Sequence, residues 1–155
     1  MDTLSIRPYR PTDLDAVIAI FLGAIRMIAA RDYDAGQIEA WAQADRQRWA
    51  VRRLDRPTWI ATIGKVPAGF TDLEPDGHLD MMYVHPDRQG QGIASALLEA
   101  VERAARDQGL ARIFTEASIT ARPFFERRGF RTLAEQQVET RGETLTNFRM
   151  EKPLS

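Results

Sequence analysis

Apolar side chains along the chain follow two spacings, one typical of helices and one typical of strands. Between residues 14 and 28 they recur three and four positions apart, which predicts a helix that opens at Thr12 and buries one face. The same spacing returns over residues 92–108, and Gly109 is expected to end that helix. Polar and apolar residues alternate over residues 4–9, which predicts a strand.

The other segments complete a mixed order of helices and strands. Residues 34–54 are expected to be helical, as one helix or two short ones, and residues 122–128 as a further short helix. The remaining expected strands are residues 59–63, 68–73, 78–84, 113–117, 131–140 and 144–152. Hairpin order favours antiparallel central strands, whereas the long helix between the fourth and fifth strands makes a β-α-β crossover, whose strands run parallel. The predicted fold class is therefore α/β of the mixed α+β kind, with helices on both faces of the sheet.

Length and composition narrow this picture to one domain covering residues 1–155. The apolar fraction is 44%, the charged fraction 28% and the formal net charge -1, so neither nucleic acid nor a membrane surface is an expected partner. No stretch approaches the ~20 apolar residues of a membrane span. The chain has no cysteine, which excludes a thiol nucleophile and suits a reducing cytoplasm, the expected location.

The segment over residues 82–94 carries the clearest chemistry in the sequence. A strand that ends at Val84 is followed by a loop with Gly90 and Gly92, and then by a helix. Helix N-termini leave backbone N–H groups unpaired and carry partial positive charge, so they favour anions, above all phosphate. Glycine removes the Cβ atoms that would hold a pyrophosphate away from the backbone, and Arg88 adds positive charge. A glycine-rich turn without a ligand is the alternative interpretation.

Other phosphate-binding loops fit this segment less well. The Gly-x-x-x-x-Gly-Lys-Ser/Thr loop of nucleotide hydrolases is absent from the sequence. A dinucleotide fingerprint needs a parallel β-α-β unit with an acidic residue about 20 positions further on, and we expect this segment to match it less well.

Two motifs resemble signatures of the GNAT superfamily of N-acetyltransferases. Residues 89–94 (QGQGIA) look like the family's Gln/Arg-x-x-Gly-x-Gly/Ala motif, and residues 82–86 look like the strand end before it. Residues 118–130 are similar to the second signature, Asn-x-x-Ala-x-x-Phe-Tyr-x-x-x-Gly-Phe. The strand order also fits the family across nearly the whole chain, as in small single-domain bacterial members. The resemblance implies a GNAT-type fold, with a mostly antiparallel central sheet that splays between its fourth and fifth strands.

The resemblance implies acetyl-CoA as co-substrate, with its pantetheine arm in the gap between those two strands. The backbone of Met82 and Val84 would pair with the arm, and the amides of residues 89–95 would hold the pyrophosphate. Ser118 occupies the position of an Asn that often contacts the arm in relatives, and serine is shorter. The expected acetyl-CoA-binding residues are Met82, Tyr83, Val84, Arg88, Gln89, Gly90, Gln91, Gly92, Ile93, Ala94, Ser95, Ser118, Phe124 and Phe125.

The resemblance also implies acetyl transfer to a primary amine of a small molecule or peptide, by direct attack in a ternary complex. Such an amine has a pKa near ~10, so a carboxylate beside the gap is expected to take its proton. Asp80 stands where many relatives carry a catalytic Glu, and Glu116 lies on the next strand; a structural carboxylate is the alternative for each. Many relatives protonate the leaving thiolate with a tyrosine where this chain has Phe125. Tyr33 is the substitute expected to be catalytic, and Tyr83 is the weaker one.

The acceptor side of the family's site is built by the first helices and the final strands. Trp41 and Asn147 are therefore expected substrate contacts, although tryptophans are more often core residues. His78 and His85 lack metal-ligand spacing, so no metal is expected. A non-catalytic acyl-CoA-binding module is the alternative function, because Phe125 lacks the hydroxyl group that many relatives use in catalysis. A homodimer through the last strand is left open.

Overall fold

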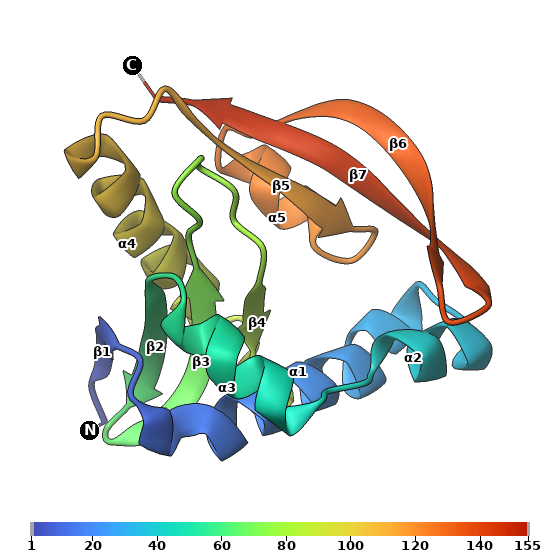
Figure 1. The fold of residues 1–155 in the computed structure, drawn as a ribbon, viewed down its shortest axis with the longest axis horizontal. Helices are drawn as coiled ribbons and strands as arrows, with labels where there is room; N and C mark the ends of the chain where they lie inside the picture. The colour runs from blue at the N-terminus through green and yellow to red at the C-terminus, as the bar shows by residue number, and fades with distance from the viewer. Residues whose placement is uncertain (1, 155) are drawn as a thin grey trace.

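The computed structural model describes residues 2–154, in which helices and strands alternate in mixed order (Figure 1). The strands are β1 (Leu4–Pro8), β2 (Thr58–Ile63), β3 (Val66–Asp72), β4 (Met82–Val84), β5 (Arg112–Ser118), β6 (Arg131–Thr140) and β7 (Glu143–Pro153). The helices are α1 (Leu14–Met27), α2 (Ala35–Trp41), α3 (Arg46–Leu54), α4 (Ile93–Asp107) and α5 (Arg122–Arg127), with 3-10 turns η1 (Pro11–Asp13), η2 (Ala29–Arg31) and η3 (Pro86–Arg88). Over residues 2–154, every helix is too short or too polar to cross a membrane.

The strands form two antiparallel sheets that meet at one place. The first has the order β1-β2-β3-β4 and the second β5-β7-β6. Among the described residues one parallel bridge, His78 to Phe114, joins them, and the Leu79 N–H donates to the Phe114 carbonyl at 2.9 Å. From that bridge, β4 and β5 diverge towards Val84 and Ser118 (Figure 1). The mixed fold class and the predicted split between the fourth and fifth strands are both confirmed.

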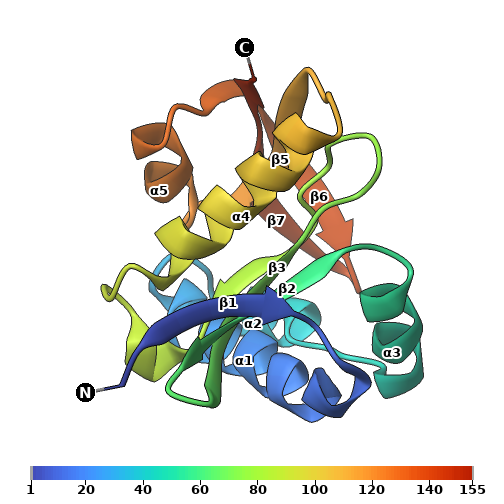
Figure 2. The same ribbon diagram turned by 90° about the vertical axis from the view of Figure 1, so that its left-hand side faces the viewer.

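Helices cover both faces of the first sheet because its strands carry apolar side chains on both faces. Ile60 on β2 belongs to the cluster packed by α1, whereas Ala61 packs with Ile93 and Leu97 of α4. Figure 2 shows α4 and α1 on opposite sides of β1, β2 and β3. A Cβ at Gly69 on β3 would lie 2.9 Å from the Ile93 Cγ2, so glycine lets α4 approach closely. This packing fixes the N-terminus of α4 beside the end of β4.

The second sheet ends in a long β6–β7 hairpin that arches towards α2 (Figure 1). Arg141 and Gly142 form its turn with φ of 46° and 83°, the backbone that two-residue hairpin loops require. The Gln37 side chain donates to the Thr144 carbonyl at 2.8 Å, and the Arg141 guanidinium donates to the Ala40 carbonyl at 2.6 Å. The hairpin and α2 therefore support each other on the side of the molecule opposite α4.

The first helix starts later than the sequence predicted. Residues 11–13 form the turn η1, and α1 begins at Leu14, so Thr12 is not the N-cap of α1. Asp13 is the N-cap of α1 instead, and its carboxylate accepts the Arg10 N–H at 2.8 Å and two bonds from the Arg7 guanidinium at 2.8 Å each. These contacts from β1 and the loop lower the pKa of Asp13, with the Arg7 hydrogen bond as the largest cause.

The fourth strand is shorter than the predicted residues 78–84. Only β4, Met82–Val84, pairs regularly with β3. The Asp72 Oδ1 accepts the N–H groups of Asp80 and Met81, each at 2.9 Å. A side chain thus takes the place of the strand partner, and the regular ladder with β3 stops before Asp80 and Met81.

Candidate functional site

A cleft of about 540 Å³ opens where β4 and β5 separate. Of the residues expected to bind acetyl-CoA, only Gln91 is missing from its lining, and Trp41 also lines it. Asp80, Glu116, Tyr33 and Asn147 lie outside this lining. The cleft has two ends, which we call the phosphate end (residues 88–95 with the neighbouring arginines) and the reacting end (Tyr83 and Trp41 with the polar groups beside β4).

The phosphate end is formed by the loop before α4. Gly90 and Gly92 have φ of 74° and 81°, a left-handed backbone that glycine adopts without strain. Among the described atoms, nothing lies within 4 Å of a Cβ built on either glycine. The Gln89 side chain folds back and donates to the Val84 carbonyl at 3.0 Å, so it leaves the helix tip open. The positive φ gives glycine a second role that the sequence argument, based only on the missing Cβ, did not include.

The amides at this tip are free to face a ligand. The first hydrogen bond within α4 runs from the Ala96 N–H to the Gly92 carbonyl at 3.1 Å, so the N–H groups of residues 93–95 precede it. Unpaired amides with the positive end of a helix dipole fit a phosphate or pyrophosphate.

Four arginines also line the cleft: Arg31, Arg88, Arg127 and Arg128. The Arg128 guanidinium donates to the Ser95 Oγ and lies 4.6 Å from the Phe124 ring centre. It therefore links the end of α5 to the first turn of α4. Sequence reasoning named only Arg88, because the other three lie on segments distant from the glycine loop.

A buried ion pair supports the chain before β4 at the reacting end. The Arg53 Nη1 lies 3.1 Å from the Asp72 Oδ2, and both side chains are fully buried. The guanidinium packs against the Trp49 and Phe70 rings, 5.6 Å and 5.9 Å from their centres. Burial raises the pKa of Asp72, while the Arg53 charge and the backbone N–H donors act against that shift. The sequence gives no sign of this pair, since nothing marks Arg53 as buried on a helix as polar as α3.

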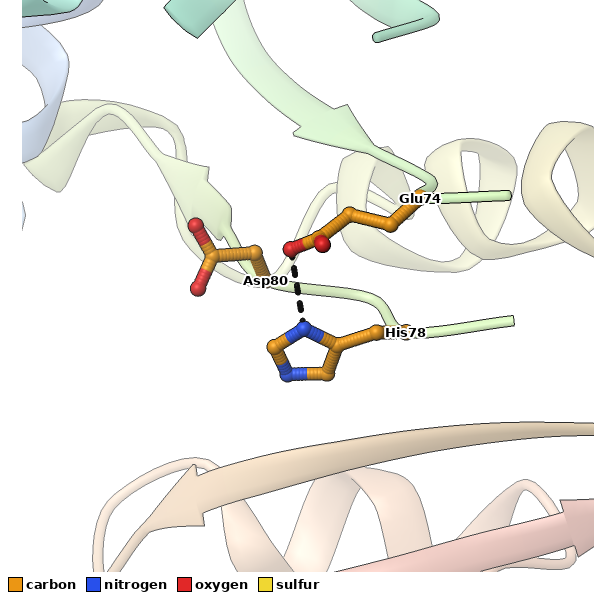
Figure 3. Close-up of side chains that lie close together, drawn as sticks. All are labelled: Glu74, His78 and Asp80. Carbon is orange, nitrogen blue, oxygen red and sulfur yellow. Dashed lines mark hydrogen bonds and ion pairs between the residues drawn. The ribbon is translucent and has the colours of Figure 1, made fainter. Parts of the chain in front are cut away.

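The predicted acid Glu116 and the unpredicted Glu74 both contact a histidine that sequence reasoning set aside. The His78 Nε2 lies 2.7 Å from the Glu116 Oε1, and its Nδ1 lies 2.9 Å from the Glu74 Oε1 (Figure 3 draws the second contact). The ring stacks on Phe114 with centres 5.0 Å apart. The Glu116 hydrogen bond is the largest cause that raises the pKa of His78 to about 9, so His78 is charged at neutral pH. A charged His78 thus bridges the β4 and β5 sides of the split.

Three of these side chains, Glu74, His78 and Asp80, are close enough together to hold a metal ion (Figure 3). Arg56 already supplies positive charge there, because its Nη1 lies 2.7 Å from the Glu74 carboxylate and 3.5 Å from the Asp80 carboxylate. The group is therefore balanced by Arg56 and His78 without a metal. The expectation of no metal stays a prediction.

The two candidate tyrosines differ in what their hydroxyl groups contact. The Tyr33 hydroxyl donates to the Thr146 carbonyl at 2.5 Å and accepts the Ile119 N–H at 3.0 Å, so it ties the α1–α2 connection to β7. A catalytic role for Tyr33 stays a prediction that these contacts do not favour. Tyr83 lines the cleft, and burial is the largest cause that raises its pKa.

Of the two expected substrate residues, Trp41 lines the cleft and Asn147 does not. Trp41 packs edge-on against Tyr33, with ring centres 5.4 Å apart. Asn147 pairs with Ser118 across β7 and β5, and its buried Oδ1 has no hydrogen-bond partner within residues 2–154. Their roles as acceptor contacts stay predictions.

Comparisons with known proteins agree with this geometry. The family model described as an acetyltransferase (GNAT) domain matches residues 29–152. The N-acetyltransferase YafP of Escherichia coli (strain K12) is 40% identical over 150 residues, which cover 97% of this chain and 96% of YafP. A crystal structure of a GCN5-related N-acetyltransferase from Rhodopseudomonas palustris, also named as a class-II aminotransferase, has a TM-score of 0.95. It is 39% identical, and the match covers 99% of this chain and 98% of that one.

A more distant structure has the same fold. YncA from Salmonella typhimurium, solved with its cofactor acetyl-CoA, has a TM-score of 0.75 at 20% identity and covers 99% of this chain and 95% of YncA. The family match, the high identity to YafP and the split between β4 and β5 lead to one conclusion: the chain belongs to the GNAT family of N-acetyltransferases.

Proposed function

We propose that the chain transfers an acetyl group from acetyl-CoA to a primary amine of a small molecule or peptide, by direct attack in a ternary complex. The observation that carries the proposal is the cleft itself, which joins an open helix tip to the gap between β4 and β5. The acetyl-CoA held by YncA, a protein of the same fold, supports the choice of donor.

The residues of the cleft fit the parts of the donor. The amides of residues 93–95 and the arginines of the phosphate end suit the pyrophosphate. The edge of β4 that faces the gap offers the backbone of Met82 and Val84 to the pantetheine arm. Ser118 and Phe125 line the same cleft from the β5 side and from α5.

The reaction then needs a base beside the gap. The ammonium of the acceptor first gives up one proton to become a neutral amine. Its nitrogen then bonds to the acetyl carbon and loses a second proton as the amide forms, while the carbon–sulfur bond breaks to leave the CoA thiolate. Asp80 lies just before β4, and Glu116 lies on β5 with its carboxylate hydrogen-bonded to His78. One of these two carboxylates accepts each proton in turn, directly or through water, and passes it to solvent.

The test measures CoA release over a panel of amines with wild type, Asp80→Asn and Glu116→Gln. Removal of the general base should lower kcat by about 100-fold or more. Glu99→Gln is the matched control, because Glu99 is an exposed carboxylate on α4 outside the cleft.

Acetyl-CoA binding without thiol release for any amine would contradict the enzyme and favour an acyl-CoA-binding module, which the missing hydroxyl at Phe125 suggests. Equal rates for Glu99→Gln and both site variants would instead contradict the role of the two acids.

A further inference from the structure

Phe125 leaves the reacting end without the tyrosine that the family resemblance led us to expect in α5. Phe125 is buried, lines the cleft and packs against the Phe124 and Phe130 rings, with centres 5.3 Å and 5.0 Å away. Another hydroxyl in the cleft must face the sulfur of the donor if the thiolate is to be stabilised by a side-chain O–H.

The hydroxyl side chains in the lining of the cleft are Tyr83, Ser95, Ser118 and Thr120. The Ser95 Oγ accepts a hydrogen bond from the Arg128 guanidinium at the phosphate end, so it lies away from the reacting end. The Thr120 Oγ1 donates a hydrogen bond to the Asp32 Oδ2 at 2.7 Å. Neither side chain is therefore placed to donate to the sulfur.

Ser118 and Tyr83 remain. The Ser118 Oγ accepts the Ala121 N–H at 3.0 Å, which orients it towards the turn that starts α5. Tyr83 comes from β4, the strand that borders the gap, and its ring is held edge-on by Phe21 at 5.0 Å and beside Phe70 at 5.8 Å. Rigid aromatic contacts of this kind fix the direction of the hydroxyl without using it.

The charge state of Tyr83 suits a hydrogen-bond donor. Burial and the nearby Asp80 and Asp72 raise the pKa of Tyr83, so its proton is present throughout the physiological range. The nearby Trp41 side chain acts against this rise, and because an indole can only donate, the phenol proton stays available for another acceptor. A thiol has a pKa near ~8.5, far below that of this phenol, so the proton is shared with the sulfur and stays on the oxygen.

We propose that Tyr83 is a catalytic residue that donates a hydrogen bond to the sulfur as the carbon–sulfur bond breaks. The inference rests on the proposed acetyl transfer and assigns the stabiliser of its leaving group. No proton is transferred in this contact: both protons lost by the acceptor nitrogen pass through the carboxylate base to solvent, and the thiolate leaves hydrogen-bonded to Tyr83.

The test titrates the thiol of bound CoA by its thiolate absorbance, in wild type and in Tyr83→Phe. Loss of a hydrogen bond to a charged atom should raise the pKa of the bound thiol by about one unit and lower kcat about tenfold. KM for acetyl-CoA should stay within about threefold, because the phosphate end is unchanged. Since phenylalanine keeps the ring, the aromatic packing and the melting temperature should be preserved.

Two further variants make the outcome specific. Tyr9→Phe is the matched control, because Tyr9 is partly buried against the same core cluster but lies outside the cleft lining. An unchanged thiol pKa in Tyr83→Phe, or a rise seen in Ser118→Ala instead, would overturn the assignment while CoA binding still supports the proposed function. A wild-type protein that does not bind CoA would overturn both.

Discussion

The two ends of the cleft are built in different ways. The phosphate end is built mainly on the backbone of one continuous segment, with Gly90 and Gly92 in the left-handed conformation and the first turn of α4 after them, and arginine side chains lie around it. The reacting end consists of side chains from α2, α3, β3, β4 and β5, which fold contacts bring together. Binding of the anion therefore depends on backbone shape, whereas the chemistry depends on a buried polar frame.

Asp72→Ala is the change expected to have the largest effect, and it acts on the frame of the reacting end. It leaves the buried Arg53 charge without its partner and the N–H groups of Asp80 and Met81 without an acceptor. Breaking a buried ion pair in this way should cost about 3–5 kcal/mol of unfolding free energy. Urea denaturation of the variant and the wild type measures the loss.

Two companion variants separate the frame from the phosphate end. Asp72→Asn keeps an oxygen for the two amides, so it should destabilise less than Asp72→Ala. Arg53→Met combined with Asp72→Asn should cost less than the sum of the single changes, because no buried charge is left. Asp72→Asn should also leave the affinity for 3′-phospho-ADP, the CoA fragment without pantetheine, within about threefold, since no charge-assisted bond is lost there. A large loss of that affinity would mean that the two ends are not independent.

Gly92→Val should have the next largest effect, and it acts on the phosphate end alone. Valine at φ of 81° is strained, and a shifted loop loses amide contacts to the pyrophosphate. Loss of one or two charge-assisted hydrogen bonds predicts a fall in CoA affinity of about 100-fold. Isothermal titration with CoA measures the change.

Gly109→Val is the matched control for this experiment. Gly109 follows the other end of α4 with φ of 72°, and a Cβ there also meets open space among the described atoms. Both variants should lose about 1–2 kcal/mol of stability from the same backbone strain. If Gly109→Val weakened CoA binding as much as Gly92→Val, strain in general would explain the loss and the loop would not be the anion site.

The two ends also differ in how well sequence predicts them. The glycine loop could be interpreted from consecutive residues, because the strand end, the glycines and the helix start are neighbours in the chain. Asp80 and Glu116 were expected near the gap from strand alternation and family resemblance. His78 was set aside for lack of metal-ligand spacing, since its partner Glu116 lies 38 positions away and only the fold joins them.

The fold shows the same limit. The order of helices and strands and the split sheet could be predicted, because apolar periodicity and crossover rules act over short stretches. The start of the fourth strand could not, because the sequence over residues 78–84 does not show that the Asp72 side chain takes the amides of Asp80 and Met81. The start of α1 could not either, since Thr12 is a good capping residue but Asp13 is fixed by Arg7 on β1.

His78→Gln should change stability as little as the glycine variants do, and it tests whether the reacting end alone responds to pH. The pKa of His78 is raised from 6.5 to about 9 in the folded chain, with the Glu116 hydrogen bond as the largest cause. Its charged form therefore stabilises the fold fully below pH 6.5, and this contribution is lost as pH rises through about 9. Because Glu116 is about one-third exposed, solvent screening reduces the contribution to about 1–2 kcal/mol at pH 6.

Comparison of urea unfolding for wild type and His78→Gln at pH 6 and pH 9.5 gives the size of this contribution. Proton NMR follows the charge directly, because His78 is one of only two histidines in the chain. Glu116→Gln should lower the pKa of His78 and reduce the pH dependence, since it removes the main partner. A His78 that titrates near 6.5 in the folded protein would contradict the ionic bridge, and the β4 and β5 sides would then be joined by backbone bonds, the Thr115 hydroxyl and the Phe114 stacking.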